Sequence, residues 1–477
     1  RAIIDTYIHV TWHCRINLDR FIASPKMSRL LVTLLLSSSS RYAGAFVAKP
    51  AGVNRSSISR SLSSSLSVSI SDAFDGGNIE FVGEETGSND TALVKLKIKK
   101  DPFTELEQKN HFQYFSFRSV CPGEKSVKYV IENAGEASYA NAWDGSTVFY
   151  SPTINDPNNW KRVLDTKFED GKLTWTHDGS GYFSYFPPYS YNRHLDLIAK
   201  CGDNVFTLGK TLDGREVDCV KLGSGDKIAY LIHRQHPGES MAEYFAEGLL
   251  ERLLGVNGSV DGLVASLLQK YTFYIVPNMN PDGSVRGHLR TNAGGQNLNR
   301  EWAPSENYDA PTLERSPEVY QVLKKMQETG VDAFLDIHGD EDLPFNFLSG
   351  SEGLTNWGPR LKALHGAFLA SYERANSDIQ VAHGYTPDAP NEGNTKICSN
   401  QIGSRFDCFA GTLEMPFKDC LTNSDPERGW SPARSKQLGA SVLDALAYIH
   451  PYLRDESDFW TTLPAADDYV CPTSEYK

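Results

Sequence analysis

The sequence predicts an α/β fold with a mixed, mostly parallel sheet and helices on both faces, preceded by a small antiparallel β-sandwich domain. Two observations lead to this prediction. Between about residues 80 and 190, short runs rich in aromatic and β-branched residues are separated by turn residues and lack a helical period. From about residue 195 onward, apolar strand-like runs alternate with helical patterns, which is typical of layered α/β domains. The length of 477 residues leaves room for both domains.

The residues before these domains have the composition of a targeting sequence. Residues 1–26 contain no methionine, and we expect an upstream or disordered segment there. Met27 then opens a basic end, a seven-residue apolar core and a serine run, and residues 47–71 are rich in serine and free of acidic residues. The segment 27–75 therefore resembles the bipartite presequence of algae with secondary plastids, which implies a plastid location. The alternative is a disordered tail on a cytoplasmic protein.

The first folded domain is expected over residues 76–193. Val94, Leu96 and Ile98 alternate with lysines, as in a strand with one buried face. Further strands are predicted at 112–117, 128–131, 147–150, 173–176 and 181–186. The aromatic run at 182–189 either walls a substrate cleft or packs between the two domains, and packing is the simpler expectation.

The second domain is expected over residues 194–455, followed by a tail at 456–477. Its predicted strands are Ala229–Ile232, Thr272–Val276, Ala333–Ile337 and Gly411–Glu414. Its predicted helices are Ser240–Leu254, Ser316–Thr329 and a last one that begins at Ser431-Pro432 and continues to Ile449. Ligands of such sheets bind beyond the carboxyl ends of the strands, so the residues at these strand ends are the candidates for a functional site.

Three residues at those strand ends form a candidate metal site. His236 and Glu239 lie three positions apart in His-Pro-Gly-Glu, at the corner between a strand and a helix, and His338 follows the strand that ends at Ile337. Zinc binds nitrogen and oxygen ligands, and a catalytic zinc site uses three protein ligands and leaves one position open. The sequence therefore predicts one zinc ion per chain, held by these residues. Glu414 ends another apolar strand, where burial would raise its pKa toward neutrality, as a general base requires.

Four motifs occur in a fixed order: His-Pro-Gly-Glu, Asn-Leu-Asn-Arg, Asp-Ile-His-Gly-Asp and Thr-Leu-Glu-Met-Pro-Phe. The set resembles the zinc carboxypeptidase (funnelin) family, within the branch of cytosolic carboxypeptidases and their bacterial relatives. The resemblance spans about Phe81 to Leu453. It implies a zinc metallocarboxypeptidase that hydrolyses the C-terminal peptide bond of peptides or protein tails with a metal-activated water.

The resemblance also implies roles for further residues. Glu414 would take the proton of the attacking water and pass it to the leaving amine, and Arg290 would face the oxygen that becomes anionic. Asn299 and Arg300 would hold the terminal carboxylate of the substrate, the guanidinium by a bidentate contact. The family also has a mobile tyrosine that covers the substrate, and Tyr385 is the candidate for it.

Cytosolic carboxypeptidases typically remove glutamate, which needs a cation facing the terminal side chain, and Lys396 and Arg405 are the nearest basic residues to the Glu414 strand. Two other functions are compatible with parts of the sequence. One is a zinc amidohydrolase of the same fold that acts on N-acyl amino acids, against which the β domain and the Thr-Leu-Glu-Met-Pro-Phe motif argue. The other is a non-catalytic binding module, against which the complete set of ligands and base argues.

Composition excludes some classes of partner. The net charge of −13 leaves no basic footprint for nucleic acid, and no apolar run is long enough for a transmembrane helix. The eight cysteines are scattered, without a Cys-x-x-Cys pair, and are expected to be buried free thiols. A disulfide among Cys398, Cys408 and Cys420 is the alternative.

Overall fold

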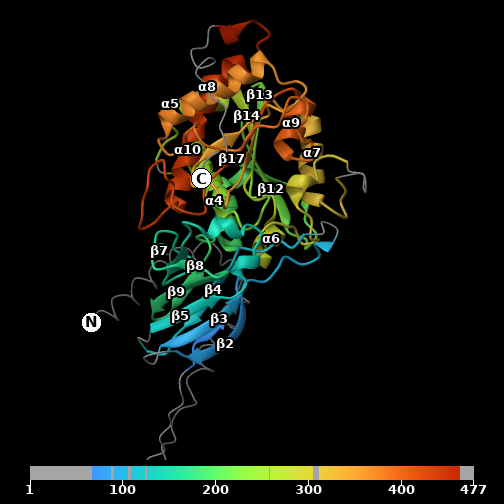
Figure 1. Cartoon of the computed structure of the whole chain (residues 1–477). Helices are drawn as coiled ribbons and strands as arrows, with labels where there is room; N and C mark the ends of the chain where they lie inside the picture. The colour runs from blue at the N-terminus through green and yellow to red at the C-terminus, as the bar shows by residue number, and fades with distance from the viewer. Residues whose placement is uncertain are drawn as a thin grey trace, which may run out of the picture. The chain divides into compact units, whose positions relative to one another are not determined.

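The computed structural model describes residues 67–87, 91–105, 109–123, 126–256, 258–304 and 311–461. All of them belong to one unit of the chain, which begins at Ser65. They form a β domain, blue to green in Figure 1, followed by an α/β domain, green to red. The predicted upstream segment 1–26, most of the predicted presequence 27–75 and most of the predicted tail 456–477 lie outside the described residues, as do Cys14 and Cys471.

The described part of the β domain contains two sheets of five strands each. The first has the order β1 (Ser69–Ser71), β4 (Ser116–Val120), β10 (Gly181–Ser184), β6 (Val148–Ser151) and β7 (Lys161–Val163). The second has the order β2 (Glu80–Thr86), β3 (Ala92–Lys97), β5 (Ser126–Ile131), β9 (Lys172–Asp178) and β8 (Lys167–Glu169). Neighbouring strands are antiparallel except β3 and β5, which pair in parallel.

Aromatic side chains fill the space between these sheets. Phe117 and Phe183 of the first sheet contact Tyr129 and Trp175 of the second, and the ring centroids of Tyr129 and Phe183 are 4.8 Å apart. Because the contacting rings come from both sheets, the sheets pack face to face as a sandwich. The predicted sandwich is confirmed, and the face that begins with Val94 is buried as expected.

Strand β1 lies inside the segment that the sequence assigns to the presequence. It pairs with β4, so that Ser69 is opposite Val120 and Ser71 is opposite Arg118. Removal of the chain up to residue 75 would therefore take a strand out of the first sheet. Cleavage before residue 67 would leave both sheets intact.

The α/β domain is built on a sheet that has seven strands within the described ranges. Its order is β11 (Val205–Lys210), β12 (Glu216–Gly223), β14 (Tyr271–Val276), β13 (Lys227–His233), β15 (Ala333–Ile337), β17 (Phe409–Glu414) and β16 (Phe347–Ser349). The central strands β14, β13, β15 and β17 are parallel, and β11, β12 and β16 are antiparallel to their neighbours, which confirms the predicted mixed sheet. Because Ile337 pairs with both His233 and Leu413, the carboxyl ends of the neighbouring strands β13, β15 and β17 lie side by side at the same end of the sheet.

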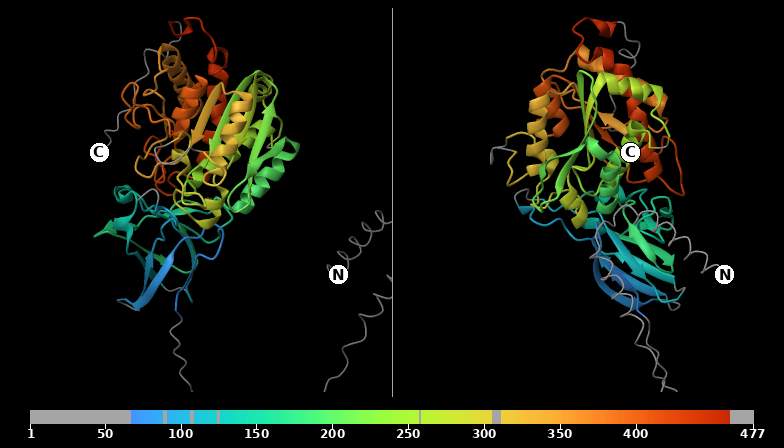
Figure 2. Two further views of the ribbon diagram at one scale, coloured as in Figure 1. Left: turned by 90° about the vertical axis from the view of Figure 1, so that its right-hand side faces the viewer. Right: turned by 180° about the vertical axis from the view of Figure 1, so that it is seen from behind.

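Helices cover both faces of this sheet, as Figures 1 and 2 show. One face packs on α4 (Ser240–Leu254), α5 (Gly262–Lys270), α8 (Pro359–Ala375) and α10 (Pro432–Ile449). The other face packs on α7 (Pro317–Thr329) and α9 (Cys398–Phe406). Along β15, Leu335 belongs to the first core and Phe334 to the second, because successive strand residues point to opposite sides. Two further helices are α3 (Tyr191–Cys201) and α6 (Pro281–Arg286).

The aromatic run that ends the β domain joins the two domains by packing and hydrogen bonds. The ring of Tyr185 stacks on that of Phe417, with centroids 4.6 Å apart. The hydroxyls of Ser240 and Tyr244 on α4 donate hydrogen bonds to the carbonyl oxygens of Pro187 and Pro188 at 2.8 and 2.7 Å. The expectation of packing between the domains is therefore confirmed.

The six cysteines within the described ranges are buried free thiols, which confirms the prediction for these six and excludes a disulfide among Cys398, Cys408 and Cys420. Burial raises the pKa of the Cys408 thiol to about 12, so that it stays protonated. In the part of the chain that the structure describes, no helix has the length and apolarity needed to cross a membrane.

Candidate active site

The corner between β13 and α4 presents the first two predicted metal ligands. Arg234, directly after β13, has a φ of 58°, in the left-handed region. Its buried guanidinium donates to the carbonyl oxygen of Pro237 at 2.9 Å and to Glu243 on α4 at 2.7 Å. These bonds fix the turn that contains His236 and ends at Glu239, the N-cap residue of α4. Strained backbone of this kind is held in place by its surroundings and is common at functional sites.

The three predicted zinc ligands converge. Nδ1 of His236 lies 2.7 Å from Oε1 of Glu239, and Nδ1 of His338 lies 2.8 Å from Oε2 of the same carboxylate. The two Nδ1 atoms are 3.2 Å apart, and the ligand atoms of the three buried residues all lie within 4.8 Å of one another. Two ligands at about 2.0–2.1 Å from a tetrahedral zinc ion are about 3.3 Å apart, so this donor set fits zinc.

Buried partners orient both imidazoles. Nε2 of His236 is 3.0 Å from Oδ1 of Asn297, and Nε2 of His338 is 2.9 Å from Oδ2 of Asp336. Asp336 also accepts a hydrogen bond from the amide of Gln235 at 2.6 Å. Such partners hold a ligating histidine in one tautomer and keep its other nitrogen available for the metal. Asn297 and Asp336 lie within the sequence motifs, yet the sequence alone assigns them no role.

The charges at the site favour metal binding. Burial, and then the guanidinium of Arg290, lower the pKa of His236 to about 3, so its imidazole is neutral. Burial alone would raise the pKa of Glu239, but the two histidines hold it well below its ordinary value. Burial alone would lower the pKa of His338, but the carboxylates of Asp336 and Glu239 raise it well above its ordinary value. A metal ion would therefore displace a proton from His338 on binding.

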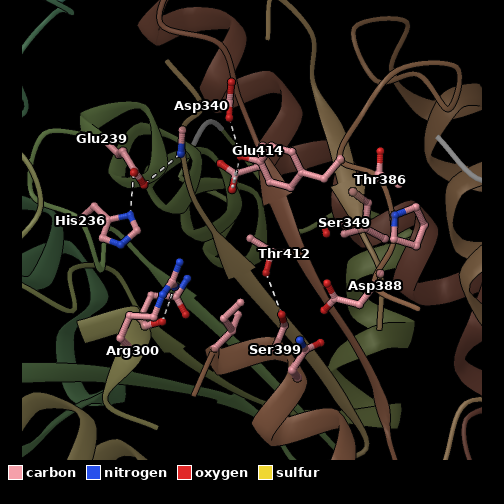
Figure 3. A pocket seen from close by; sticks show the side chains of 18 of the residues that line it. His236, Glu239, Arg300, Asp340, Ser349, Thr386, Asp388, Ser399, Thr412 and Glu414 are labelled. Carbon is pink, nitrogen blue, oxygen red and sulfur yellow. Dashed lines mark hydrogen bonds and ion pairs between the residues drawn. The ribbon is translucent and has the colours of Figure 1, made fainter. Parts of the chain in front are cut away.

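Glu414, the last residue of β17, lies across the cavity from His236 and Glu239 (Figure 3). Burial raises its pKa well above the ordinary value, an effect that His338 opposes. Its Oε2 is buried and has no hydrogen-bond partner among the described residues, and its Oε1 is 3.4 Å from the hydroxyl of Tyr385. That hydroxyl also donates to the carboxylate of Asp340. Tyr385, the candidate for the mobile tyrosine of the family, thus lies beside Glu414.

The residues predicted to hold the substrate lie between α6 and α7. Arg290 follows α6, and Asn299 and Arg300 belong to the short 3-10 helix η6 (Leu298–Arg300). The backbone N–H of Cys398 donates to Oδ1 of Asn299 at 2.8 Å and so orients that amide. Nη1 of Arg300 donates to the carbonyl oxygen of Asn299 at 2.7 Å.

One cavity of about 480 Å³ connects these groups. Its wall includes His236, Glu239, Arg290, Asn299, Arg300 and Glu414, whereas His338 is buried beside it. The β domain adds Lys109 and Tyr139 to the wall. Figure 3 shows His236, Arg300 and Glu414 on different sides of the cavity. The structure therefore brings together all seven site residues that the sequence predicts.

The part of the cavity away from the metal ligands carries hydroxyls and carboxylates. Its lining there includes Ser349, Thr386, Asp388, Ser399 and Thr412. Lys396 and Arg405 are absent from the described residues that line the cavity, and Arg405 is exposed on α9. The sequence-based expectation that Lys396 or Arg405 contacts the substrate is therefore not supported by the lining of the cavity.

Comparison with known proteins gives matches to both domains. Residues 70–187 match the cytosolic carboxypeptidase N-terminal domain, and residues 192–378 match zinc carboxypeptidase. The second match contains the three metal ligands and the residues Arg290, Asn299 and Arg300, and Glu414 lies beyond its end. A protein of Zymomonas mobilis, itself uncharacterised, is 42% identical over 80% of this chain and 96% of its own length.

Two solved structures are similar over nearly their whole length. The metallo-carboxypeptidase of Pseudomonas aeruginosa, solved in complex with (2-guanidinoethylmercapto)succinic acid, is 37% identical, and the match covers 81% of this chain and 100% of that one with a TM-score of 0.73. The metallo-carboxypeptidase of Burkholderia cenocepacia is 38% identical, and the match covers 81% of this chain and 99% of that one, again with a TM-score of 0.73.

Proposed function

The chain belongs to the zinc carboxypeptidase family, and we propose that it removes the C-terminal residue of peptides and of protein tails at the cavity beside His236, Glu239 and His338. Membership of this family makes it a zinc-dependent metallocarboxypeptidase whose substrates are peptides. Protein tails as substrates and the roles of the other side chains are the new part of the proposal. The observation that supports it best is that the metal ligands, a buried carboxylate and two arginines surround one cavity.

Glu414 is the group that moves the proton. Zinc held by the three ligands would activate a water molecule and polarise the carbonyl of the scissile bond. Glu414 is not part of the ligand cluster that the described residues form, and it faces the cavity. Its raised pKa suits a group that first accepts a proton from water and then gives it to the leaving amine.

The two arginines act on different negative charges of the substrate. Arg290 lines the cavity beside His236, where a cation would stabilise the carbonyl oxygen as it becomes anionic. Arg300 and Asn299 hold the terminal carboxylate, since a guanidinium can bind a carboxylate through two parallel hydrogen bonds. The ligand of the Pseudomonas aeruginosa relative is a succinic acid, whose carboxylates are groups that such an arginine would bind.

The amidohydrolase alternative is less well supported than the peptidase. It shares the zinc ligands, but the match of residues 70–187 to the cytosolic carboxypeptidase N-terminal domain favours a peptidase. A non-catalytic binding module would not need a buried, partner-free carboxylate oxygen opposite three converging metal ligands.

The test is a panel of substrates, assayed with and without a chelator. Peptides that differ only in their C-terminal residue, the same peptides with an amidated C-terminus, and one of the sequences fused as a tail to a folded protein are compared with an N-acyl amino acid. We expect chelator-sensitive release of the last residue from free peptides and from the tail, and slow turnover of the amides. Preferential hydrolysis of the N-acyl amino acid would support the amidohydrolase instead. Release from peptides but not from the tail would restrict the substrates to peptides.

We also propose that the residues before the β domain direct the protein to a plastid. The support is the apolar core that follows Met27 and the acid-free, serine-rich segment at 47–71. A fluorescent reporter fused to residues 27–75 and expressed in an alga with a secondary plastid should collect in that organelle. Uniform cytosolic fluorescence would support the alternative, a cytoplasmic protein.

A further inference from the structure

A carboxylate of the β domain holds the backbone of the loop that carries Arg290. Oδ1 of Asp101 accepts the N–H of Leu289 at 2.7 Å, and its Oδ2 accepts those of Arg290 and Thr291 at 2.8 and 2.9 Å. The hydroxyl of Thr291 donates to the same Oδ2 at 3.1 Å. Asp101 is only 4% exposed. Four donors from three consecutive residues thus meet one buried carboxylate, an arrangement of charge-assisted hydrogen bonds.

The same loop has two other anchors, and both hold backbone carbonyls that precede Arg290. Asn78, also from the β domain, donates to the carbonyl oxygen of Gly287 at 2.9 Å. The N–H of Gly238, in the turn between His236 and Glu239, donates to the carbonyl oxygen of Leu289 at 3.0 Å. The loop is therefore tied directly to the turn that presents two metal ligands. A small shift of Leu289 or Arg290 would change the distance between the Arg290 guanidinium and the ligands.

We propose that Asp101 is a positioning residue for catalysis: it holds the loop 289–291 so that the guanidinium of Arg290 meets the developing negative charge of the substrate. This inference rests on the role of Arg290 given in the proposed function. Asp101 is absent from the described residues that line the cavity, so it acts through Arg290 and touches no substrate. Its effect is to fix geometry, and a misplacement of about 1 Å at a catalytic group can cost about 10²-fold in rate.

The alternative is that Asp101 merely stabilises the interface between the two domains. The two roles differ in how the effects of mutations combine. If Asp101 acts through Arg290, its loss should matter only while Arg290 is present. If it only stabilises the interface, its loss should have the same effect whether or not Arg290 is present. A double-mutant cycle separates these cases.

The experiment measures kcat and KM for the full-length zinc-loaded enzyme and for Asp101→Asn, Arg290→Ala and the double variant. The asparagine places an amide against N–H donors and removes the charge. We expect kcat to fall by about 10²–10³-fold for Arg290→Ala. For Asp101→Asn we expect kcat to fall by about 10- to 100-fold, with KM changed by less than about 3-fold. The double variant should lie within about 3-fold of Arg290→Ala.

A matched control is Asp419→Asn. Asp419 is also buried, also accepts a backbone N–H, from Asp425 at 2.9 Å, and faces Arg162 of the β domain at 3.7 Å, yet it does not line the cavity. Its kcat should stay within about 3-fold of the native value. If Asp101→Asn does not fold, the cycle is repeated with Asp101→Glu, which keeps the charge and displaces it by one methylene, and the double variant should again match Arg290→Ala.

The outcomes are distinguishable. If Arg290→Ala keeps the native kcat, the proposed role of Arg290 fails and the inference about Asp101 fails with it. If Arg290→Ala loses activity while Asp101→Asn does not, or if the two effects multiply in the double variant, only the inference about Asp101 is overturned.

Discussion

The α/β domain and the β domain build the same cavity in different ways. In the α/β domain His236 and Glu239 lie in the turn between β13 and α4, His338 follows β15 directly, and Glu414 ends β17, so the carboxyl ends of neighbouring strands position all of them. The β domain contributes Lys109 and Tyr139 to the wall from its connections, and it holds the loop of Arg290 through hydrogen bonds of Asp101 and Asn78 to the loop backbone. The metal ligands and Glu414 thus lie at the ends of regular strands, which form a rigid scaffold, whereas the β domain holds the backbone of the loop that carries Arg290.

This difference separates the expected effects of mutation. Changes at the carboxyl ends of β13, β15 and β17 should affect metal binding or proton transfer. Changes on the loop between α6 and α7 should affect how the substrate and the transition state are held. Changes at Asp101 in the β domain should act through that loop, because Asp101 is absent from the described residues that line the cavity. Each of the following experiments could contradict one of these statements.

The largest effect is expected for His236→Ala, which removes a metal ligand. Zinc content should fall well below about one per chain and turnover should approach the uncatalysed background. A graded control is Asn297→Ala, which keeps the ligand and removes its orienting partner, and should weaken zinc binding by about 10–100-fold. Full zinc content in His236→Ala would show that the ligand set is wrong.

Arg300→Ala should mainly weaken substrate binding. Loss of a charge-assisted hydrogen bond costs about 1.5–3 kcal/mol, which corresponds to about a 10- to 150-fold rise in KM. An amidated peptide, which lacks the terminal carboxylate, should be hydrolysed equally slowly by the native enzyme and the variant. If the variant instead lowered kcat and left KM unchanged, Arg300 would not be the group that grips the carboxylate.

Glu318 supports the same loop from the α/β side, and its effect should be on stability alone. Its carboxylate accepts a hydrogen bond from the side-chain amide of Asn292, two residues after Arg290, at 3.3 Å. Burial raises the pKa of Glu318 from 4.5 to about 8. Between these two values the unfolded chain loses the proton while the folded protein keeps it, so Glu318 stabilises the fold most below pH 4.5 and this contribution is lost as the pH rises through 8.

The matched variant Glu318→Gln cannot ionise, so it should not lose this contribution. Urea unfolding at pH 5 and at pH 8 should show that the native protein loses stability relative to the variant, by about 1.4 kcal/mol per pH unit at most. At neutral pH the variant should keep kcat within about 3-fold, because Glu318 is not among the described residues that line the cavity. An equal pH dependence in both proteins would mean that Glu318 is ionised when folded.

The smallest effect is expected for Lys396→Leu and Arg405→Leu. Because neither residue lines the cavity, the ratio of rates on Glu-ended and Leu-ended peptides should stay within about 2-fold of the native ratio. Asp388→Asn is the positive control: it removes a negative charge that does line the cavity and should raise the relative rate on Glu-ended peptides by up to about 5-fold. A larger fall in the rate on Glu-ended relative to Leu-ended peptides, in either leucine variant, would support the sequence-based expectation that Lys396 or Arg405 faces the terminal side chain.

The sequence is informative where chemistry and spacing coincide. His236, Glu239, His338 and Glu414 are residue types with few structural uses at strand ends, and the strand Ala333–Ile337 and the helix Ser240–Leu254 have the bounds that their patterns predict. The antiparallel strands β11, β12 and β16 are not predicted, because the residues of these strands show neither a clear alternation of apolar and polar side chains nor a long apolar run.

The supporting contacts are invisible to the sequence for a different reason. Asp101 lies 188 positions before Leu289, in a segment with no motif, and an aspartate there has many ordinary uses. Ser316 illustrates the converse: it precedes α7 as a cap should, yet its hydroxyl makes no capping bond. Asn297 and Asp336 lie inside the motifs, but only the fold shows that each faces the Nε2 atom of a ligand.

The division between metal ligands and proton carrier is tested most directly by zinc stoichiometry and turnover of purified Glu414→Gln. The amide keeps the size of the side chain and cannot accept the proton, so kcat should fall by about 10²–10⁴-fold. Zinc should remain near one per chain, because the ligand cluster among the described residues is His236, Glu239 and His338. Near-native kcat, or loss of zinc together with activity, would contradict the assignment of Glu414.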